Sequence, residues 1–208
     1  MKYDRKEALR YLRATPDDEA AATLADTVYL KLRNEMQPRH ILLCCDCAAD
    51  DEGVTLDNGV RFTSRALGKH LQGCRKLLLL AATLGSKVDI AIRRLSLTSV
   101  AEGAAAQAVA AALIESYCDE IQSGADTQGL LQRPRFSPGY GDWDLAEQHK
   151  LFAVTNCSKV IGLTLTEGMM MAPSKSVTAV IGLSEDGMCV QNKCMACGNV
   201  DCPYREEK

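Results

Sequence analysis

The chain has 208 residues, a net charge of −3 at pH 7 and a sequence pI of about 5.7. A chain of this length buries one sizeable core without help from disulfides or metals. The acidic balance and an aromatic content of only 5% argue against a nucleic-acid binder, which usually presents a basic face and stacking platforms. The charged N-terminus and the short apolar run at residues 77–84 predict neither a secretory signal nor a membrane span.

Ten cysteines without a secretory signal favour a reducing compartment, so we expect a cytoplasmic protein. Three of them, Cys44, Cys45 and Cys47, lie in one apolar stretch. Neighbouring residues of a strand point to opposite faces, which makes a shared metal ion difficult, so we interpret these three as buried structural thiols. Three further cysteines within predicted elements are interpreted as packed thiols: Cys74, Cys118 and Cys157.

Two helices and a strand are predicted in the first fifty residues. Asp4 is a good helix cap, which predicts a first helix over residues 4–13. Thr15, followed by a proline and three acidic residues, is a strong start signal for a second helix over residues 16–36. The apolar stretch at residues 39–48 predicts a mostly buried strand.

The middle of the chain alternates between strands and helices. A hairpin is predicted to turn at Asn58-Gly59, and Ser64 begins a short helix. The run from Cys74 to residue 83 predicts a strand covered on both faces. Helices follow from Ser86 and from Ser99, and the second is the longest predicted helix.

The last third is predicted to contain a helix at residues 145–152 and strands at residues 161–166 and 177–184. Neither an internal repeat nor a domain-sized linker is evident. We therefore predict one α/β domain of the α+β type over residues 1–186, followed by a short cysteine-rich appendage over residues 187–208.

A loop locked by proline and glycine lies at residues 133–143, and we call it the Arg135 loop. Its prolines fix the backbone, while Gly139 permits angles or close approaches that a side chain forbids. Arg135 suits a two-pronged pair with a carboxylate or phosphate, and Tyr140 adds an aromatic face with a hydroxyl. The loop is interpreted either as a binding loop for a small polar ligand or as a surface turn.

Two polar residues near the ends of predicted strands are further candidates for ligand binding. Glu167 and Ser176 lie beside glycine and proline breaks, where an open sheet exposes groups to a ligand. The three histidines have no recognisable partners and are interpreted as structural: His40, His70 and His149. The familiar nucleotide-binding, serine-hydrolase and zinc-protease motifs are absent from the sequence.

The C-terminal tail places four cysteines within fourteen residues, at Cys189, Cys194, Cys197 and Cys202. One C-x2-C pair is a plausible metal knuckle, although a zinc ribbon normally has two such pairs separated by a longer stretch. Iron–sulfur clusters also use four closely spaced cysteines, with other spacings. Zinc, an iron–sulfur cluster and free or redox-switching thiols therefore all stay open.

The segment from Arg135 to Tyr140 resembles the S-adenosylmethionine-binding R-x-x-x-G-Y motif in the activation domain of cobalamin-dependent methionine synthase. The resemblance to stand-alone members of that family extends over about residues 3–185, through LGKHLQGCRK, AATLG, GYGDW and LTE to MMAPSKSV. It implies an α/β domain in which helices surround a twisted, largely antiparallel sheet. It does not extend clearly to the cysteine tail.

The resemblance also implies a site and a role in methionine biosynthesis. Arg135 would hold the methionine carboxylate of S-adenosylmethionine, and Gly139 and Tyr140 would shape the wall near the nucleoside. Glu7 and Glu167 are candidate partners for the ligand ammonium. No catalytic side chain is predicted, because the sulfonium methyl group is already activated and cob(I)alamin is a strong nucleophile.

A full synthase carries cobalamin, folate and homocysteine modules that this chain lacks, so the resemblance implies an accessory module. Its expected task is the reductive remethylation of cob(II)alamin on a separate methionine synthase or other corrinoid protein, with a reductase as a further expected partner. Two alternatives stay open: an iron–sulfur electron-transfer reactivase for a corrinoid protein, and an independent S-adenosylmethionine-dependent methyltransferase.

Overall fold

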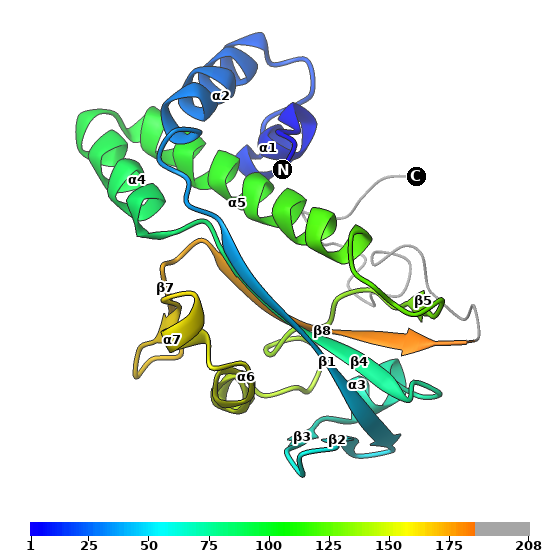
Figure 1. Ribbon diagram of the computed structural model, residues 1–208. Helices are drawn as coiled ribbons and strands as arrows, with labels where there is room; N and C mark the ends of the chain where they lie inside the picture. The colour runs from blue at the N-terminus through cyan, green and yellow to red at the C-terminus, as the bar shows by residue number, and fades with distance from the viewer. Residues whose placement is uncertain (186–208) are drawn as a thin grey trace. The chain divides into compact units, whose positions relative to one another are not determined.

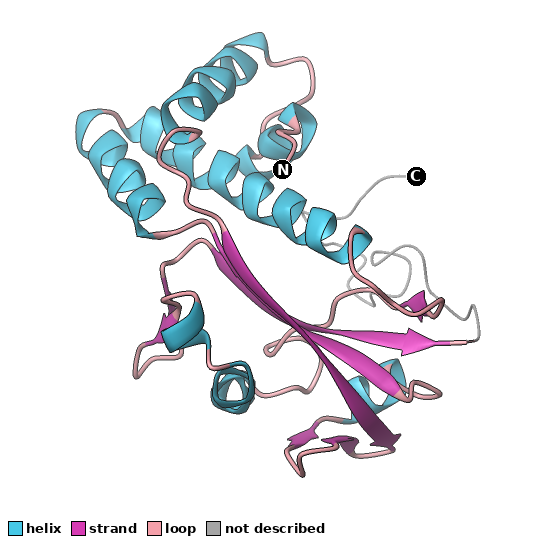
Figure 2. Cartoon of the chain, viewed as in Figure 1, coloured by secondary structure: helices cyan, strands magenta, loops and turns pink. Residues whose placement is uncertain are grey.

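The computed structural model describes residues 1–185, which form a mixed arrangement of helices and strands (Figures 1 and 2). The helices are α1 Arg5–Leu12, α2 Glu19–Leu32, α3 Arg65–His70, α4 Ser86–Thr98, α5 Val100–Ser123, the 3-10 helix η1 Leu145–Glu147, α6 Gln148–Thr155 and α7 Cys157–Val160. The strands are β1 Arg39–Asp50, β2 Gly53–Leu56, β3 Arg61–Thr63, β4 Lys76–Thr83, β5 Leu131–Gln132, β6 Thr164–Leu165, β7 Met171–Ala172 and β8 Ser176–Ser184.

Six of these strands form one sheet in the order β3-β2-β1-β4-β8-β5. The β1–β2, β2–β3 and β5–β8 pairs are antiparallel, with Cys47 opposite Leu56 in the first and Leu131 opposite Ser184 in the last. The adjacent central strands β1, β4 and β8 twist together in Figure 1. The predicted α+β class with a twisted, largely antiparallel sheet is therefore confirmed.

The described residues divide into two compact units. Among the described residues, the helical unit comprises residues 1–40, 82–124 and 170–177, and the sheet unit comprises residues 41–81, 125–169 and 178–185. The predicted boundary at residue 186 stays a prediction, because residues 186–208 lie outside the described part of the chain.

The helical unit is organised around α5, which contacts α1, α2 and α4. Helix α5 begins as predicted, with the Glu102 amide donating to the Ser99 hydroxyl at 3.3 Å. Gly103 lets α4 and α5 approach closely, since a Cβ atom there would lie 2.6 Å from the Ser96 hydroxyl. The predicted cap of α1 is also confirmed, with Asp4 accepting from the Lys6 amide at 2.9 Å.

Two predicted elements differ from the structure. Helix α2 begins at Glu19 with Asp18 as its cap, because residues from Thr15 to Asp18 form a turn of their own, closed by a 3.1 Å hydrogen bond. Strand β1 is mostly exposed or half-buried, and only Cys45 is buried among its residues. Cys44 is exposed, so its interpretation as a buried thiol is wrong.

One predicted strand is shorter in the structure and another is buried as predicted. The strand predicted at residues 161–166 is reduced to β6, whereas β4 is buried along nearly its whole length. Within residues 1–185, no helix combines the length and the apolar character that a bilayer span requires.

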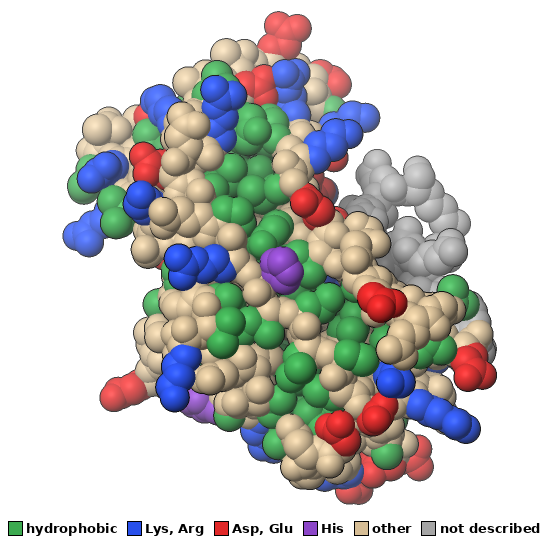
Figure 3. Space-filling model, in the orientation of Figure 1, with side chains coloured by type: hydrophobic (Ala, Val, Ile, Leu, Met, Phe, Trp, Pro, Cys, Tyr) green, Lys and Arg blue, Asp and Glu red, His purple; other side chains and the backbone are tan. Residues whose placement is uncertain are grey.

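The face drawn in Figure 3 has acidic and basic side chains interspersed around apolar ones, in line with a net charge near zero.

Candidate functional site

The first half of the Arg135 loop runs beside β8 as an irregular extra strand. The Arg133 amide donates to the Gly182 carbonyl at 2.8 Å. Phe136 and Val180 exchange two backbone hydrogen bonds of 2.9 and 2.8 Å. These bonds tie the backbone on both sides of Arg135 to the sheet.

The side chain of Arg133 also anchors the loop. This buried residue donates from its guanidinium to the Gln72 carbonyl at 2.8 Å. A Cβ atom at Gly182 would lie 3.3 Å from Arg133 Cδ and only 2.7 Å from Cys74 Sγ. The absence of a side chain at Gly182 therefore makes room for Arg133 against β8.

The second half of the loop folds into a compact turn. The Tyr140 amide donates to the Ser137 carbonyl at 3.1 Å, and the Gly139 amide donates to the Trp143 carbonyl at 2.8 Å. Gly139 has a φ of +93°, a left-handed conformation that glycine adopts without strain. The prolines and glycines of the sequence thus build a rigid turn.

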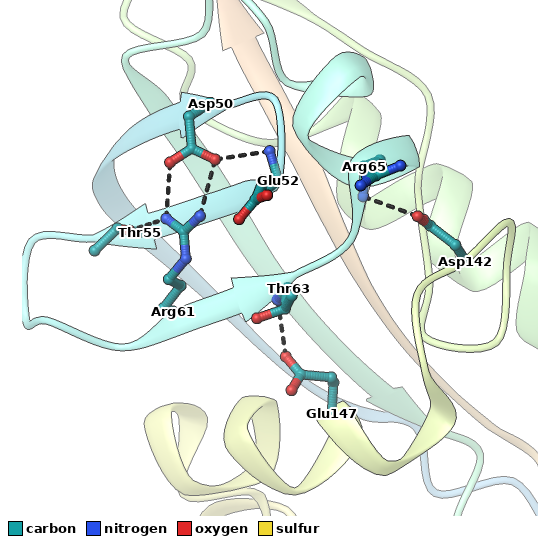
Figure 4. A network of polar contacts seen from close by, with 8 residues as sticks. All are labelled: Asp50, Glu52, Thr55, Arg61, Thr63, Arg65, Asp142 and Glu147. Atoms are coloured by element: carbon teal, nitrogen blue, oxygen red, sulfur yellow. Dashed lines mark hydrogen bonds and ion pairs between the residues drawn. The ribbon is translucent and has the colours of Figure 1, made fainter.

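Asp142 fastens the end of this turn to the start of α3, as the Arg65 contact in Figure 4 shows. Its carboxylate accepts hydrogen bonds from the Ser64 hydroxyl at 2.5 Å and from the Arg65 and Ala66 amides at 3.0 Å each. Helix α3 has no acidic residue in its own first turn, so Asp142 supplies the missing negative charge. The Ser64 hydrogen bond and then the Ala66 amide hold the pKa of Asp142 below its ordinary value.

Trp143 anchors the loop in the core of the sheet unit. It is only 1% exposed and packs edge-on against Phe62, with ring centroids 5.5 Å apart. Its ring also stacks with that of Phe136, with ring centroids 6.1 Å apart. Burial of this large side chain fixes the loop by apolar contact, in addition to the polar contacts of Asp142.

A polar network supports the segment that follows the loop (Figure 4). Glu147 accepts from the Thr63 amide at 3.1 Å and from Lys150 at 2.5 Å. Lys150 also donates to the Arg61 carbonyl at 2.8 Å. These bonds tie η1 and α6 to the β2–β3 hairpin, so the chain on the far side of the loop is also held.

Three of the six predicted ligand-binding residues share this loop. Arg135 is half-buried between the two fixed peptide segments. Gly139 is exposed, and a Cβ atom there would come within 4 Å only of Leu145 Cδ1, at 3.6 Å. Tyr140 is 65% exposed. The loop thus presents a cation, an open backbone position and an accessible aromatic ring within six residues, which suits a ligand that carries both an anion and a flat ring.

The other three predicted ligand-binding residues lie on separate elements. Glu7, in α1 of the helical unit, forms an ion pair with Arg10. Ser176, also in the helical unit, is buried and donates to the Pro173 carbonyl at 2.7 Å. Glu167 is exposed in a turn of the sheet unit. Their roles toward a ligand stay predictions.

The predicted metal ligands Cys189, Cys194, Cys197 and Cys202 lie outside the described residues. Within residues 1–185, no group of three or more histidine, cysteine, aspartate or glutamate side chains gathers as a metal site would. Burial raises the pKa of Cys47 to about 12 and also raises that of Cys45, so neither thiol is activated.

Sequence reasoning missed the contacts that position the loop. The sequence alone assigns no role to Asp142 and predicts only a structural role for His70, whose Nε2 lies 2.9 Å from the Pro134 carbonyl oxygen. One signal was available for Asp142: a helix that begins at Ser64 without an acidic first turn invites a carboxylate from elsewhere.

Comparison with known proteins places this loop in a family. Residues 117–189 match the model of the vitamin B12 dependent methionine synthase activation domain, a region that contains the entire Arg135 loop. This part of the chain is therefore similar to that activation domain. No curated protein sequence matches the chain significantly. The resemblance inferred from the R-x-x-x-G-Y motif is therefore confirmed by an independent match.

A solved structure shares the fold of this chain. The crystal structure of the MetH reactivation domain bound to AdoHcy superposes with a TM-score of 0.64 at 15% sequence identity. The match covers 85% of the present chain and 69% of that chain. At this identity the likeness establishes the shared fold.

Proposed function

We propose that this chain binds S-adenosylmethionine at the Arg135 loop and supports the reductive remethylation of cob(II)alamin on a separate methionine synthase or other corrinoid protein. The observation that carries the proposal is the geometry of Arg135, Gly139 and Tyr140, which share one rigid loop inside the family-matched region. The relative of known structure holds AdoHcy, the demethylated form of the proposed ligand.

The residues of the loop fit the proposed ligand. The guanidinium of Arg135 suits the methionine carboxylate, because its planar donors match the two carboxylate oxygens. The exposed ring of Tyr140 offers a face for the nucleoside, and Gly139 leaves room for close backbone approach. Glu167, in the same unit, is one proposed partner for the ligand ammonium, and the ligand-binding roles of Glu7 and Ser176 stay proposals from the sequence.

The proposed reaction needs no general acid or general base from the chain. One electron from a partner reductase reduces the cobalt, the methyl carbon then passes from sulfur to cobalt, and the C–S electron pair leaves with the sulfur as S-adenosylhomocysteine. The chain's own contribution is to hold the ligand and orient its methyl group, which reduces the entropic part of the barrier. We therefore propose an accessory module with little turnover in the absence of its partner.

Calorimetric titration with S-adenosylmethionine tests the binding site. Replacing Arg135 with alanine removes a charge-assisted pair, so we expect affinity to fall about tenfold to a hundredfold. Arg61→Ala is the matched control, because Arg61 in the β2–β3 hairpin is occupied by Asp50 and Thr55. Wild-type affinity in the Arg135→Ala variant, or no binding to the wild-type chain, would refute the proposal.

Affinity purification from cell lysate in the presence of S-adenosylmethionine tests the partner. We expect a corrinoid protein to be retained by the wild-type chain and lost with Arg135→Ala. Methyl transfer from S-adenosylmethionine to a small molecule or protein without any corrinoid would instead favour the independent methyltransferase.

The cysteine tail carries a second proposal from sequence alone. Cys189, Cys194, Cys197 and Cys202 are proposed ligands of zinc or of an iron–sulfur cluster. Anaerobic purification followed by metal analysis and visible absorption separates the two: a coloured protein containing iron supports an electron-transfer role, and a colourless protein containing zinc excludes it.

A further inference from the structure

The last residue of α3, His70, holds the beginning of the Arg135 loop. Its Nε2 atom lies 2.9 Å from the carbonyl oxygen of Pro134. A carbonyl oxygen only accepts hydrogen bonds, so Nε2 carries the hydrogen and donates it. The loop is therefore fastened at both ends of one short helix, by Asp142 at its first residues and by His70 at its last.

The His70 ring makes a second contact with the loop. Its centroid lies 5.0 Å from that of Phe136, and the two rings are tilted by 32°. Phe136 is the residue that exchanges backbone hydrogen bonds with Val180. The peptide groups on the two sides of Arg135 are thus held by different elements, Pro134 by α3 and Phe136 by β8.

The middle of the loop also fits closely against α3. A Cβ atom on Gly141, which has a φ of +58°, would lie 2.8 Å from the Cβ atom of Ala66. Gly68 of the same helix is packed so tightly that an added Cβ would lie 2.1 Å from the Asp50 carbonyl oxygen. Helix α3 is therefore fixed against the neighbouring chain at Asp50 and acts as a rigid support for the loop.

The contribution of His70 is one of hydrogen-bond geometry. Burial lowers the pKa of His70, the Pro134 hydrogen bond raises it and the charge of nearby Arg133 lowers it, so the pKa lies below its ordinary value. A lowered pKa favours the neutral imidazole, which adds no positive charge beside the loop arginines. What it supplies is a donor aimed at one carbonyl oxygen and a ring packed on one side chain.

We propose that His70 is a positioning residue for ligand recognition: chiefly its hydrogen bond to Pro134, and secondarily its ring contact with Phe136, fixes the backbone of Arg135 in the geometry that pairs with the ligand carboxylate. The inference rests on the proposed function and adds a residue that need not touch the ligand. Holding the arginine in place before binding removes an ordering cost from the binding step.

Two variants separate the donor of His70 from its ring. His70→Phe keeps a ring beside Phe136 and loses the hydrogen bond, whereas His70→Gln keeps an N–H donor and loses the ring. In titrations with S-adenosylmethionine we expect His70→Phe to weaken binding about threefold to tenfold, because one net hydrogen bond is lost. His70→Gln should bind within about twofold of wild type. Equal affinity in His70→Phe and wild type would overturn the inference.

Hydrogen exchange in the ligand-free chain provides a readout that does not depend on the ligand. The Phe136 amide, which donates to Val180, should exchange faster in His70→Phe than in wild type. The Arg133 amide, which donates to Gly182, is the internal reference and should be unchanged. Unchanged exchange at Phe136 would refute the positioning role even if the wild-type chain binds S-adenosylmethionine. Failure of the wild-type chain to bind, with the exchange difference intact, would refute the proposed function instead.

Discussion

The two units of this chain are stabilised in different ways. In the helical unit, α5 contacts α1, α2 and α4, and its close approach to α4 depends on Gly103. In the sheet unit, the Arg135 loop is held by side chains far away in sequence, such as Ser64, which is 78 residues from its partner Asp142. Helix packing on α5 thus organises the first unit, whereas polar contacts between residues distant in sequence position the candidate site in the second.

The largest expected effect comes from the core anchor of the loop. Trp143→Ala should lower the free energy of unfolding by about 3–5 kcal/mol, because a fully buried aromatic side chain is lost. Val100→Ala in the helical unit is the control, since Val100 is 87% exposed and its truncation should stay within about 0.5 kcal/mol. Urea unfolding followed by far-UV circular dichroism measures both. Similar costs for the two variants would remove the contrast between them.

A smaller effect is expected where the loop packs on β8. Gly182→Ala places a methyl group against Cys74 and Arg133, so we expect a loss of about 1–3 kcal/mol from overpacking. Gly168→Ala is the matched control, because the nearest atom to an added Cβ there, beyond the adjacent residues, would be Thr166 Oγ1 at 4.0 Å. Thermal unfolding of the two variants compares them, and a neutral Gly182→Ala would show that the contact relaxes freely.

A third effect concerns the pH range in which Asp142 holds the loop. The pKa of Asp142 in the folded chain is lowered from 3.8, so its stabilisation is fully present above that value and is lost as the pH falls through the lower folded value. Asp142→Asn should therefore be less stable than wild type at pH 7. The difference between the two proteins in thermal unfolding should shrink below about pH 4. A difference that is independent of pH would contradict the charge-assisted anchor.

The smallest effect is expected from the ion pair between α2 and α5. Lys31 lies 2.6 Å from Glu102, and its side chain is 44% exposed. Lys31→Ala should cost about 0.2–1 kcal/mol at low salt, and the cost should fall as salt is added. Chemical unfolding at two salt concentrations measures it. A cost comparable to that of Trp143→Ala would show that the helical unit also depends on specific polar contacts.

The elements that could be predicted from sequence are those set by local interactions. The caps at Asp4, Ser64 and Ser99 act on amides within three residues, so they are visible in the sequence. The hairpin turn at Asn58-Gly59 is equally local, and Gly59 has the expected positive φ of +83°. For the same reason, the rigid character of the Arg135 loop was predictable from its prolines and glycines.

The elements that could not be predicted depend on competition or on distance. Thr15 is a reasonable cap, but the helix instead begins after Asp18, whose side chain accepts a hydrogen bond from the Ala21 amide. The burial of β1 was overestimated because an apolar sequence does not reveal which neighbours cover a strand. The partners of His70 and Asp142 are 64 and 78 residues away, and no periodicity connects residues across such separations.

The central claim is that the Arg135 loop, held on α3, is the binding site for S-adenosylmethionine. The most direct measurement is the change in backbone amide NMR shifts on titration with this ligand. We predict the largest shifts at the amides from Arg135 to Asp142, saturating with the calorimetric affinity and greatly reduced in Arg135→Ala. Saturable binding that leaves these amides unshifted, or no shifts anywhere in the wild-type chain, would contradict the claim.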